Sequence, residues 1–299
     1  MFILNSLCRN DKYLYNSALN VIAKSKKPGS SKQLFSVLQK FEELATKVNP
    51  SFIPCAITHS IILEGLRKDP SMSCKHETVD AAEGILNETM QRYRNGENRF
   101  RPKLVMFDQV IMLIANSHIP NKTERAWKIF LLLKQAQEEL SIKELHPKAH
   151  TYNWLLTCAT FEIGDNMSKN PISILELATK IYTEMKESED PSLQVDSLTY
   201  HNLLNIARKF IPNEVHKRNV IEDIFVRCCL DGLVDRGILK TLHNCSPGIF
   251  YERVIGEDGK GYRPFVDANN YPEVWMRNVA SEYRPQHPVP ENDSAEFSI

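Results

Sequence analysis

The sequence has no hydrophobic run long enough to cross a membrane, which takes about 20 predominantly apolar residues. Its first ten residues, MFILNSLCRN, contain Asn5 and Arg9, which interrupt the apolar core that a signal peptide needs. They also lack the long Arg- and Ser-rich stretch of a transit peptide. We therefore expect an intracellular protein without a membrane span.

The sequence also lacks net charge and paired cysteine motifs. It has 37 basic and 37 acidic residues, which argues against an indiscriminate polyanion binder, because such proteins are usually basic. Its cysteines are odd in number and form no C-x-x-C motif. This pattern predicts reduced thiols and argues against disulfides or a zinc site. The cysteines are Cys8, Cys55, Cys74, Cys158, Cys228, Cys229 and Cys245.

No catalytic motif is complete in this sequence. His76 and Glu77 are adjacent, whereas a zinc deaminase needs H-x-E together with C-x-x-C. The run GEDGKGY at 256–262 lacks the spacing of a phosphate-binding loop. His146 and His150 are four residues apart, but Pro147 between them disfavours a regular helical metal site. We expect no enzymatic activity, no metal and no cofactor.

The sequence does contain a pattern that recurs five times. An anchor residue, usually aromatic, is followed by apolar residues three, four and seven places later, which puts all four on one helical face. The anchors recur at intervals of about 44 to 48 residues. They are Tyr15, His59, Phe107, Tyr152 and Tyr200.

A second apolar stripe with the same offsets follows each anchor stripe. These second stripes begin at Leu34, Ala82, Ala126, Ala178 and Ile221. Two such helices form an αα-hairpin that cannot bury its apolar side alone, so successive hairpins should stack. We predict an all-α, right-handed αα-hairpin solenoid over residues 1–242. Its units lie near 11–50, 53–98, 101–143, 146–190 and 195–233.

The remaining residues are predicted to form a cap and a tail. Residues 243–283 carry apolar and aromatic side chains that could cover the last hairpin, and a short β-hairpin is expected near 250–266. Residues 284–299 are rich in proline and polar residues, and we expect them to be disordered. The apolar residues of the cap are Ile249, Phe250, Tyr251, Phe265, Tyr271 and Trp275.

Two runs, HPKAHTYNWLLTCA at 146–159 and VDSLTYHNLLNIA at 195–207, resemble the first helix of pentatricopeptide repeats. ELATKIYTEMKES at 176–188 is similar to that family's second helix. The long insertions between helices resemble divergent algal and stramenopile forms, and YPEVWMRNVA at 271–280 is similar to a tail found in them. The resemblance covers residues 11–242. A tetratricopeptide array would favour a 34-residue period and a W-x2-L-G-x2-Y helix, and neither is present.

The resemblance implies single-stranded RNA in a groove lined by the first helices, one base per repeat. The residue two before each anchor would stack on bases, and these stacking positions are Tyr13, Ile57, Val105, His150 and Leu198. The residue after each anchor and the last residue of the unit would read a base edge. These base-reading pairs are Asn16 with Cys55, Ser60 with Lys103, Asp108 with Lys148, Asn153 with Asp196, and His201 with Asp235.

Alternatives remain at these positions. Buried contacts between repeats would suit the same stacking side chains, and Lys103 and Lys148 would serve as phosphate contacts or as solvated junction residues. Asn153 with Asp196 matches a pair that the family uses for pyrimidines, chiefly uracil, whereas the other four pairs are not interpretable.

The functional expectation is RNA binding in organelle RNA processing, stability or translation, in a mitochondrion or plastid. The alternative is a protein-interaction solenoid scaffold without RNA binding, which the neutral charge favours. A further possibility is that the chain is part of a longer protein. The sequence does not predict the oligomeric state.

Overall fold

The computed structural model describes residues 12–47, 53–71, 75–163, 171–250 and 273–285. The described chain is all-helical and contains no strand, which confirms the all-α prediction for these residues. It divides into two compact units, residues 1–147 and 148–299. No helix in the described ranges has the length and apolarity needed to span a bilayer.

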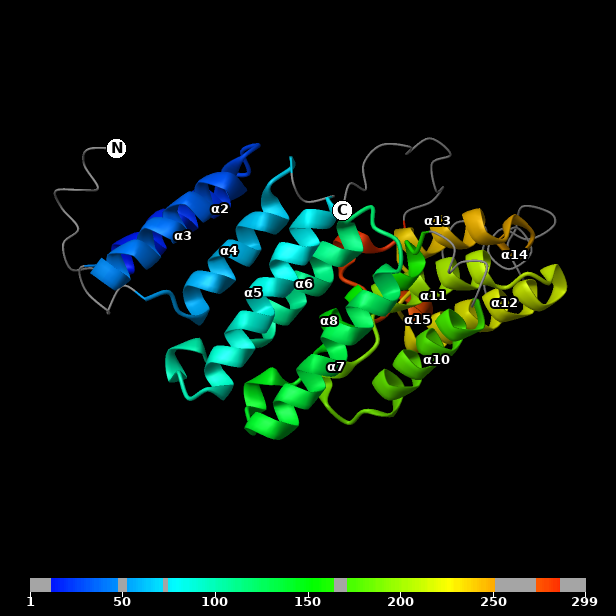
Figure 1. The fold of residues 1–299 in the computed structure, drawn as a ribbon. Coiled ribbons are helices and arrows are strands. Elements are labelled where there is room, and N and C mark those ends of the chain that lie inside the picture. The colour runs from blue at the N-terminus through cyan, green and yellow to red at the C-terminus, as the bar shows by residue number, and fades with distance from the viewer. Residues whose placement is uncertain (1–11, 48–52, 72–74, 164–170, 251–272, 286–299) are drawn as a thin grey trace. The chain divides into compact units, whose positions relative to one another are not determined.

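The first unit consists of three helix pairs joined by short loops (Figure 1). Within each pair the two helices pack together, and the first helices of successive pairs also contact one another: α2 packs on α4, and α4 on α6. The elements are α2 (Lys12–Lys24), α3 (Ser30–Lys47), α4 (Ala56–Lys68), α5 (His76–Arg94), η2 (Asn98–Phe100), α6 (Leu104–Asn116), α7 (Lys122–Leu140) and η3 (Lys143–Leu145).

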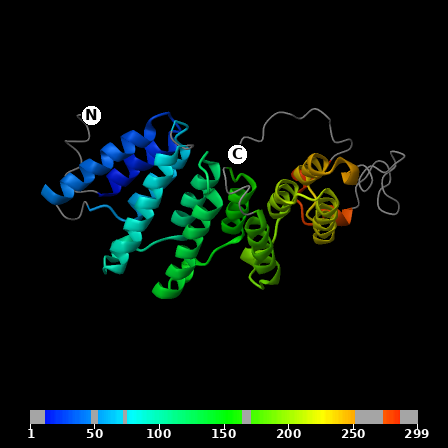
Figure 2. The ribbon, with the colours of Figure 1, turned by 45° about the vertical axis from the view of Figure 1, so that its right-hand side comes forward.

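The second unit continues the alternation of first and second helices (Figure 2). α8 packs on α10 and on α11, and α11 packs on α12 and on α13. Its elements are α8 (Ala149–Thr160), α10 (Pro171–Glu187), η4 (Pro191–Leu193), α11 (Ser197–Phe210), α12 (Glu214–Asp231), α13 (Arg236–Cys245), α14 (Pro247–Phe250), α15 (Glu273–Met276) and η6 (Ser281–Tyr283).

The predicted apolar stripes form the cores of both units. The anchors His59, Phe107, Tyr152 and Tyr200 are almost completely buried, while Tyr15 in the first helix is half-buried. The small residues Ala82, Ala126 and Ala178, which open three of the second stripes, are buried as well. The 3.6-residue period explains this result, because residues three, four and seven places apart share one side of a helix.

Buried or half-buried charged side chains complete several helix ends. Asp69 accepts hydrogen bonds from the backbone N–H and the hydroxyl of Ser31, at the start of α3. Burial alone would raise the pKa of Asp69, but hydrogen bonds from Ser31 and Ser71 outweigh it and hold the pKa well below its usual range. The Lys122 ammonium donates to two carbonyls at the end of α6, and Lys209 does the same for α8. The lysines satisfy carbonyls at helix ends, and Asp69 satisfies a backbone N–H at a helix start, all of them groups without a partner within the helix.

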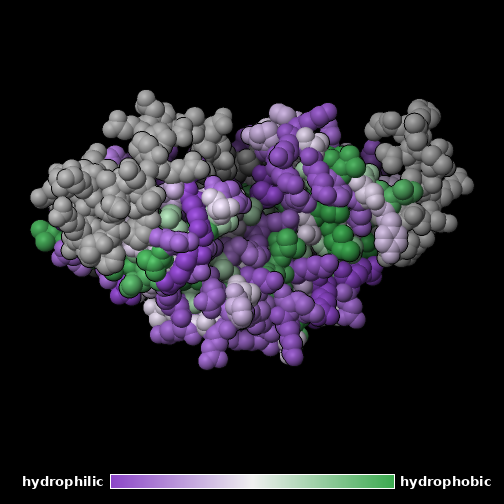
Figure 3. Space-filling model, turned by 180° about the vertical axis from the view of Figure 1, so that it is seen from behind, coloured by the Kyte–Doolittle hydropathy of each residue, from purple (hydrophilic) through white to green (hydrophobic). Residues whose placement is uncertain are grey.

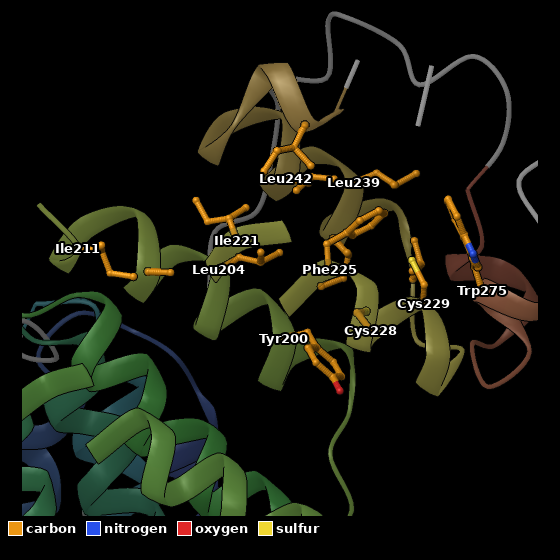
Figure 4. Packing of buried hydrophobic residues seen from close by; sticks show 14 residues of the cluster. Tyr200, Leu204, Ile211, Ile221, Phe225, Cys228, Cys229, Leu239, Leu242 and Trp275 are labelled. Atoms are coloured by element: carbon orange, nitrogen blue, oxygen red, sulfur yellow. The ribbon is translucent and has the colours of Figure 1, made fainter. Parts of the chain in front are cut away.

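The second unit has a core that includes the C-terminal segment (Figure 4). Trp275 of α15 meets the ring of Phe225 edge-on, with centroids 5.6 Å apart. The backbone N–H of Val234 donates to the carbonyl of Trp275 at 2.8 Å. Gly232, which ends α12 at φ +70°, lies so close to the segment that a Cβ would be 3.1 Å from the carbonyl oxygen of Val274.

Two of the six residues predicted for the cap, Ile249 and Trp275, are buried in this core. The side chain of Phe250, together with Tyr251, Phe265, Tyr271 and the expected β-hairpin, lies outside the described residues, as do residues 286–299 of the predicted tail. α13 was not predicted as a separate helix. Its apolar stripe is short and has an aliphatic residue, Leu239, where the other first helices have a ring.

His59 should make the stability of this protein depend on pH between about 4 and 6.5. Its imidazole is 2% exposed, and burial, followed by the positive charge of Arg92, lowers its pKa to about 4. The Thr89 hydroxyl donates to the Ile85 carbonyl at 2.8 Å, so the Nδ1–H of His59 donates to that hydroxyl at 2.7 Å. The native imidazole is therefore neutral, with its proton on Nδ1.

The unfolded chain binds a proton at His59 below pH 6.5, whereas the folded chain does so only near pH 4. The stability that depends on a neutral, buried His59 is therefore complete above pH 6.5 and is lost as the pH falls toward 4. We expect His59 to lower the free energy of unfolding by about 1 kcal/mol between pH 7.5 and 5.5. Denaturant titrations at both pH values measure this change in the wild type. The His59→Phe variant is the control, since phenylalanine does not titrate. Identical pH profiles for the two proteins would disprove the assignment.

Candidate nucleic-acid interface

The five predicted stacking positions occupy the same place in their helices: each is the second residue of a first helix. A residue two places before the anchor is rotated by about 200° from it, so it points away from the core that the anchor enters. The side chains are accordingly exposed: Tyr13 by 70%, Ile57 by 49%, Val105 by 45% and Leu198 by 42%, and His150 is exposed too. The alternative in which these residues are buried between repeats does not fit these exposures.

Neighbouring first helices place these side chains in rows. In the first unit α2, α4 and α6 pack successively and carry Tyr13, Ile57 and Val105. In the second unit α8 and α11 pack together and carry His150 and Leu198. We call these two sets the stacking rows. Figure 3 shows one face of the molecule, on which the described hydrophobic residues form separate small groups among hydrophilic ones.

The row in the second unit ends at α13. This helix packs on α11 in the order of a further first helix, and Asp235 caps it as Asp196 caps α11. Its second residue is Gly237, which has no side chain to offer a base.

The second members of the base-reading pairs are all N-caps. Cys55, Lys103, Lys148, Asp196 and Asp235 each precede the first residue of a first helix. Two of them cap with their side chains: Asp196 accepts from the backbone N–H of Thr199 at 2.9 Å, and Asp235 from that of Ile238 at 2.7 Å. Capping therefore accounts for both carboxylates, because Asp is among the preferred N-cap residues.

The structure brings Asn153 and Asp196 into direct contact. The Asn153 amide nitrogen donates to both carboxylate oxygens of Asp196, at 3.0 and 2.9 Å. The amide oxygen accepts from the hydroxyl of Thr199 at 2.8 Å. Asn153 is 2% exposed and Asp196 is half-buried. The one base-reading pair that matches the family's pattern thus uses its hydrogen-bonding groups within the protein.

An equivalent hydrogen bond occurs in the first unit. The Thr58 hydroxyl donates to the amide oxygen of Asn16 at 2.9 Å, across from α4 to α2. Thr58 and Thr199 are both the third residue of their helix, and each hydroxyl also accepts from the backbone N–H of its N-cap. We call this contact, from the threonine of one first helix to the asparagine of the preceding one, the Asn–Thr hydrogen bond.

His201 is engaged in a similar way with α13. Its Nδ1 lies 2.7 Å from the Thr241 hydroxyl, and its Nε2 lies 3.2 Å from the amide nitrogen of Asn205. That amide also donates to the His201 carbonyl, which fixes its orientation. Nε2 is therefore the acceptor and Nδ1 carries the proton. Burial lowers the pKa of His201, although the charge of Asp235 opposes this effect.

The remaining base-reading residues differ in accessibility. Asp108 is buried in the first unit, and Ser60 is half-buried. Lys103 and Lys148 are exposed, as their alternative role in phosphate contacts requires.

Sequence reasoning missed the threonine that precedes the anchor. Thr58, Thr151 and Thr199 stand directly before His59, Tyr152 and Tyr200, so the recurrence is visible in the sequence. Each is the third residue of its helix and accepts a hydrogen bond from the backbone N–H of the N-cap residue three places earlier. The partner in the preceding first helix requires the structure.

The chain was compared with protein-family models, with curated proteins and with solved structures, and none of them matches it. Among the residues with described positions, no three His, Cys, Asp or Glu side chains form a group able to hold a metal ion.

Proposed function

We propose that this chain is a divergent pentatricopeptide-like repeat protein that binds single-stranded RNA. Bases stack on the second residues of its first helices, one base per repeat. The hairpins would stack as a right-handed solenoid whose first helices line the RNA groove. The observation that carries this proposal is the stacking rows: an apolar or aromatic side chain is exposed at the same helical position in five successive first helices.

We assign a ligand to these exposed side chains because they recur at the same position in each first helix. Single exposed apolar residues are ordinary in folded proteins and need no explanation. Side chains at one repeated position, on helices that pack side by side, instead form a periodic surface. Bases offer flat apolar faces at regular intervals along an unpaired strand, and stacking on protein side chains contributes about 1–3 kcal/mol per base for aromatic residues.

The cellular role follows from the resemblance to pentatricopeptide repeats. We propose a function in organelle RNA processing, stability or translation, in a mitochondrion or plastid. Only the binding activity rests on the stacking rows.

A second candidate is a protein-interaction scaffold. Three of the five stacking residues, Ile57, Val105 and Leu198, are aliphatic, and such side chains pack against a protein partner as well as against a base. The formal net charge of zero also suits this function.

The test is a titration of the whole chain with labelled single-stranded RNA of random sequence at 50 and 200 mM salt. A double-stranded RNA of the same length serves as the control. We expect single-stranded RNA to bind more tightly, because paired bases cannot stack on side chains, and to bind more weakly at the higher salt. Failure of the folded chain to bind single-stranded RNA at 50 mM salt would contradict the proposal and favour the scaffold.

A further inference from the structure

We propose that this protein recognises unpaired RNA with little regard to base sequence, because three of its base-reading residues, Asn16, Asn153 and His201, hold adjacent first helices together instead. This inference rests on the proposed function and specifies its ligand: any single-stranded RNA whose bases can reach the stacking rows. It departs from what the resemblance implies for Asn153 and Asp196.

The stacking residues are exposed, whereas the base-reading residues directly after the anchors are buried or half-buried. The stacking residues Ile57, Val105 and Leu198 expose 42 to 49% of their surface, whereas Asn153 exposes 2% and Asp108 6%. A base edge can hydrogen-bond to a side chain only if the polar atoms reach it. The exposed set contacts bases by their faces, which all four bases share, and the buried set holds the atoms that could distinguish one base from another.

The hydrogen bonds of Asn153 explain why its side chain stays buried. Reading a base with Asn153 would require its amide to leave Asp196 and Thr199, and both partners would then lose a hydrogen bond. The backbone carbonyl of Asn153 also faces the amide of Asn202 in the next first helix. Breaking a buried network of this kind costs more than one base contact returns, since the groups left behind lose hydrogen bonds where water does not readily replace them.

Similar hydrogen bonds join other pairs of adjacent first helices, so the contact is a repeated feature of the fold. Asn16 accepts from Thr58 between α2 and α4, and His201 joins α11 to Thr241 of α13. In each case the residue directly after the anchor meets a hydroxyl of the following first helix. These residues are therefore positioning residues, which set how neighbouring stacking residues are spaced.

The experiment compares the whole chain bound to ten-nucleotide oligomers of uridine, cytidine and adenosine. We expect dissociation constants within about tenfold of one another, with adenosine the tightest, because purines present the larger stacking face. Leu198→Ala should weaken all three by a similar factor. Val226→Ala, on α12 and also exposed, is the matched control and should change none of them.

Asn153→Ala distinguishes positioning from reading. We expect the ratio of the uridine and adenosine affinities to change less than about twofold, whereas a base-reading contact would change it about 5- to 150-fold. The structural role predicts a lower midpoint of denaturation instead. Asn16→Ala repeats the test at an equivalent hydrogen bond if Asn153→Ala does not fold.

The results distinguish failure of this inference from failure of the proposed function. A strong preference of the wild type for uridine that disappears in Asn153→Ala would overturn this inference and leave the proposed function standing. Absence of binding to all three oligomers would overturn both.

Discussion

Replacing all five stacking residues by alanine is expected to lower the affinity for single-stranded RNA at least about 100-fold and to leave the fold intact. If the two aromatic side chains contribute about 1 kcal/mol each, the lower end of their range for stacking on bases, and the three aliphatic ones about half as much, the combined loss exceeds two powers of ten. The free energy of unfolding should change little, because these side chains are exposed at the second position of their helices. The residues are Tyr13, Ile57, Val105, His150 and Leu198.

The control variant must remove exposed apolar side chains that lie outside the stacking rows. Five other exposed apolar side chains lie away from the starts of the first helices, and their joint replacement by alanine should alter RNA affinity less than about threefold. They are Val21, Leu131, Val215, Val226 and Leu230. Fluorescence anisotropy measures the affinities, and circular dichroism checks the helix content of both variants. Equal losses of affinity in the two variants would show that the stacking rows are not the binding surface.

The fold could be read from the sequence where a helix buries one complete face. Phe107 with Val110, and Tyr200 with Leu204, are fully buried because their spacing places them on the same side of a helix. The loops followed from Pro and polar residues between the stripes. α13 was not predicted as a helix because Leu239 stands where the other first helices have an aromatic ring, and because the helix has only ten residues.

The site could be read only in part. The five stacking positions share one place in their helices, and their exposure follows from rotation about the helix axis. Whether Asn153 faces solvent or Thr199 depends on how closely α8 and α11 pack, and one chain's periodicity carries no such information. The buried partners of Asp69 and Lys209 are hidden for the same reason: each satisfies the end of another helix, far away in the sequence.

The close packing of adjacent hairpins is testable at Gly65, in the last turn of α4. A Cβ built there would lie 2.1 Å from Cδ1 of Leu34 and 3.3 Å from Cβ of Ala23. Leu34 is fully buried beside Leu19 and Ala23, so it has little room to move aside. Glycine within a helix is unfavourable by about 1 kcal/mol relative to alanine, and here the close approach of the first hairpin explains its presence.

Gly65→Val is expected to destabilise the first unit by about 3 kcal/mol, since the added methyl groups must displace Leu34 or separate α4 from α2. Gly84→Val in α5 is the matched control: no atom lies within 4 Å of its Cβ position, and its effect should stay within about 0.5 kcal/mol. Denaturant unfolding followed by circular dichroism measures both, and hydrogen exchange should show lost protection in α2, α3 and α4. Because α2 carries Tyr13, a loosened first hairpin should also weaken RNA binding. Similar stabilities for the two variants would mean that adjacent hairpins approach less closely, and the Asn–Thr hydrogen bond between α2 and α4 would then lose its geometric basis.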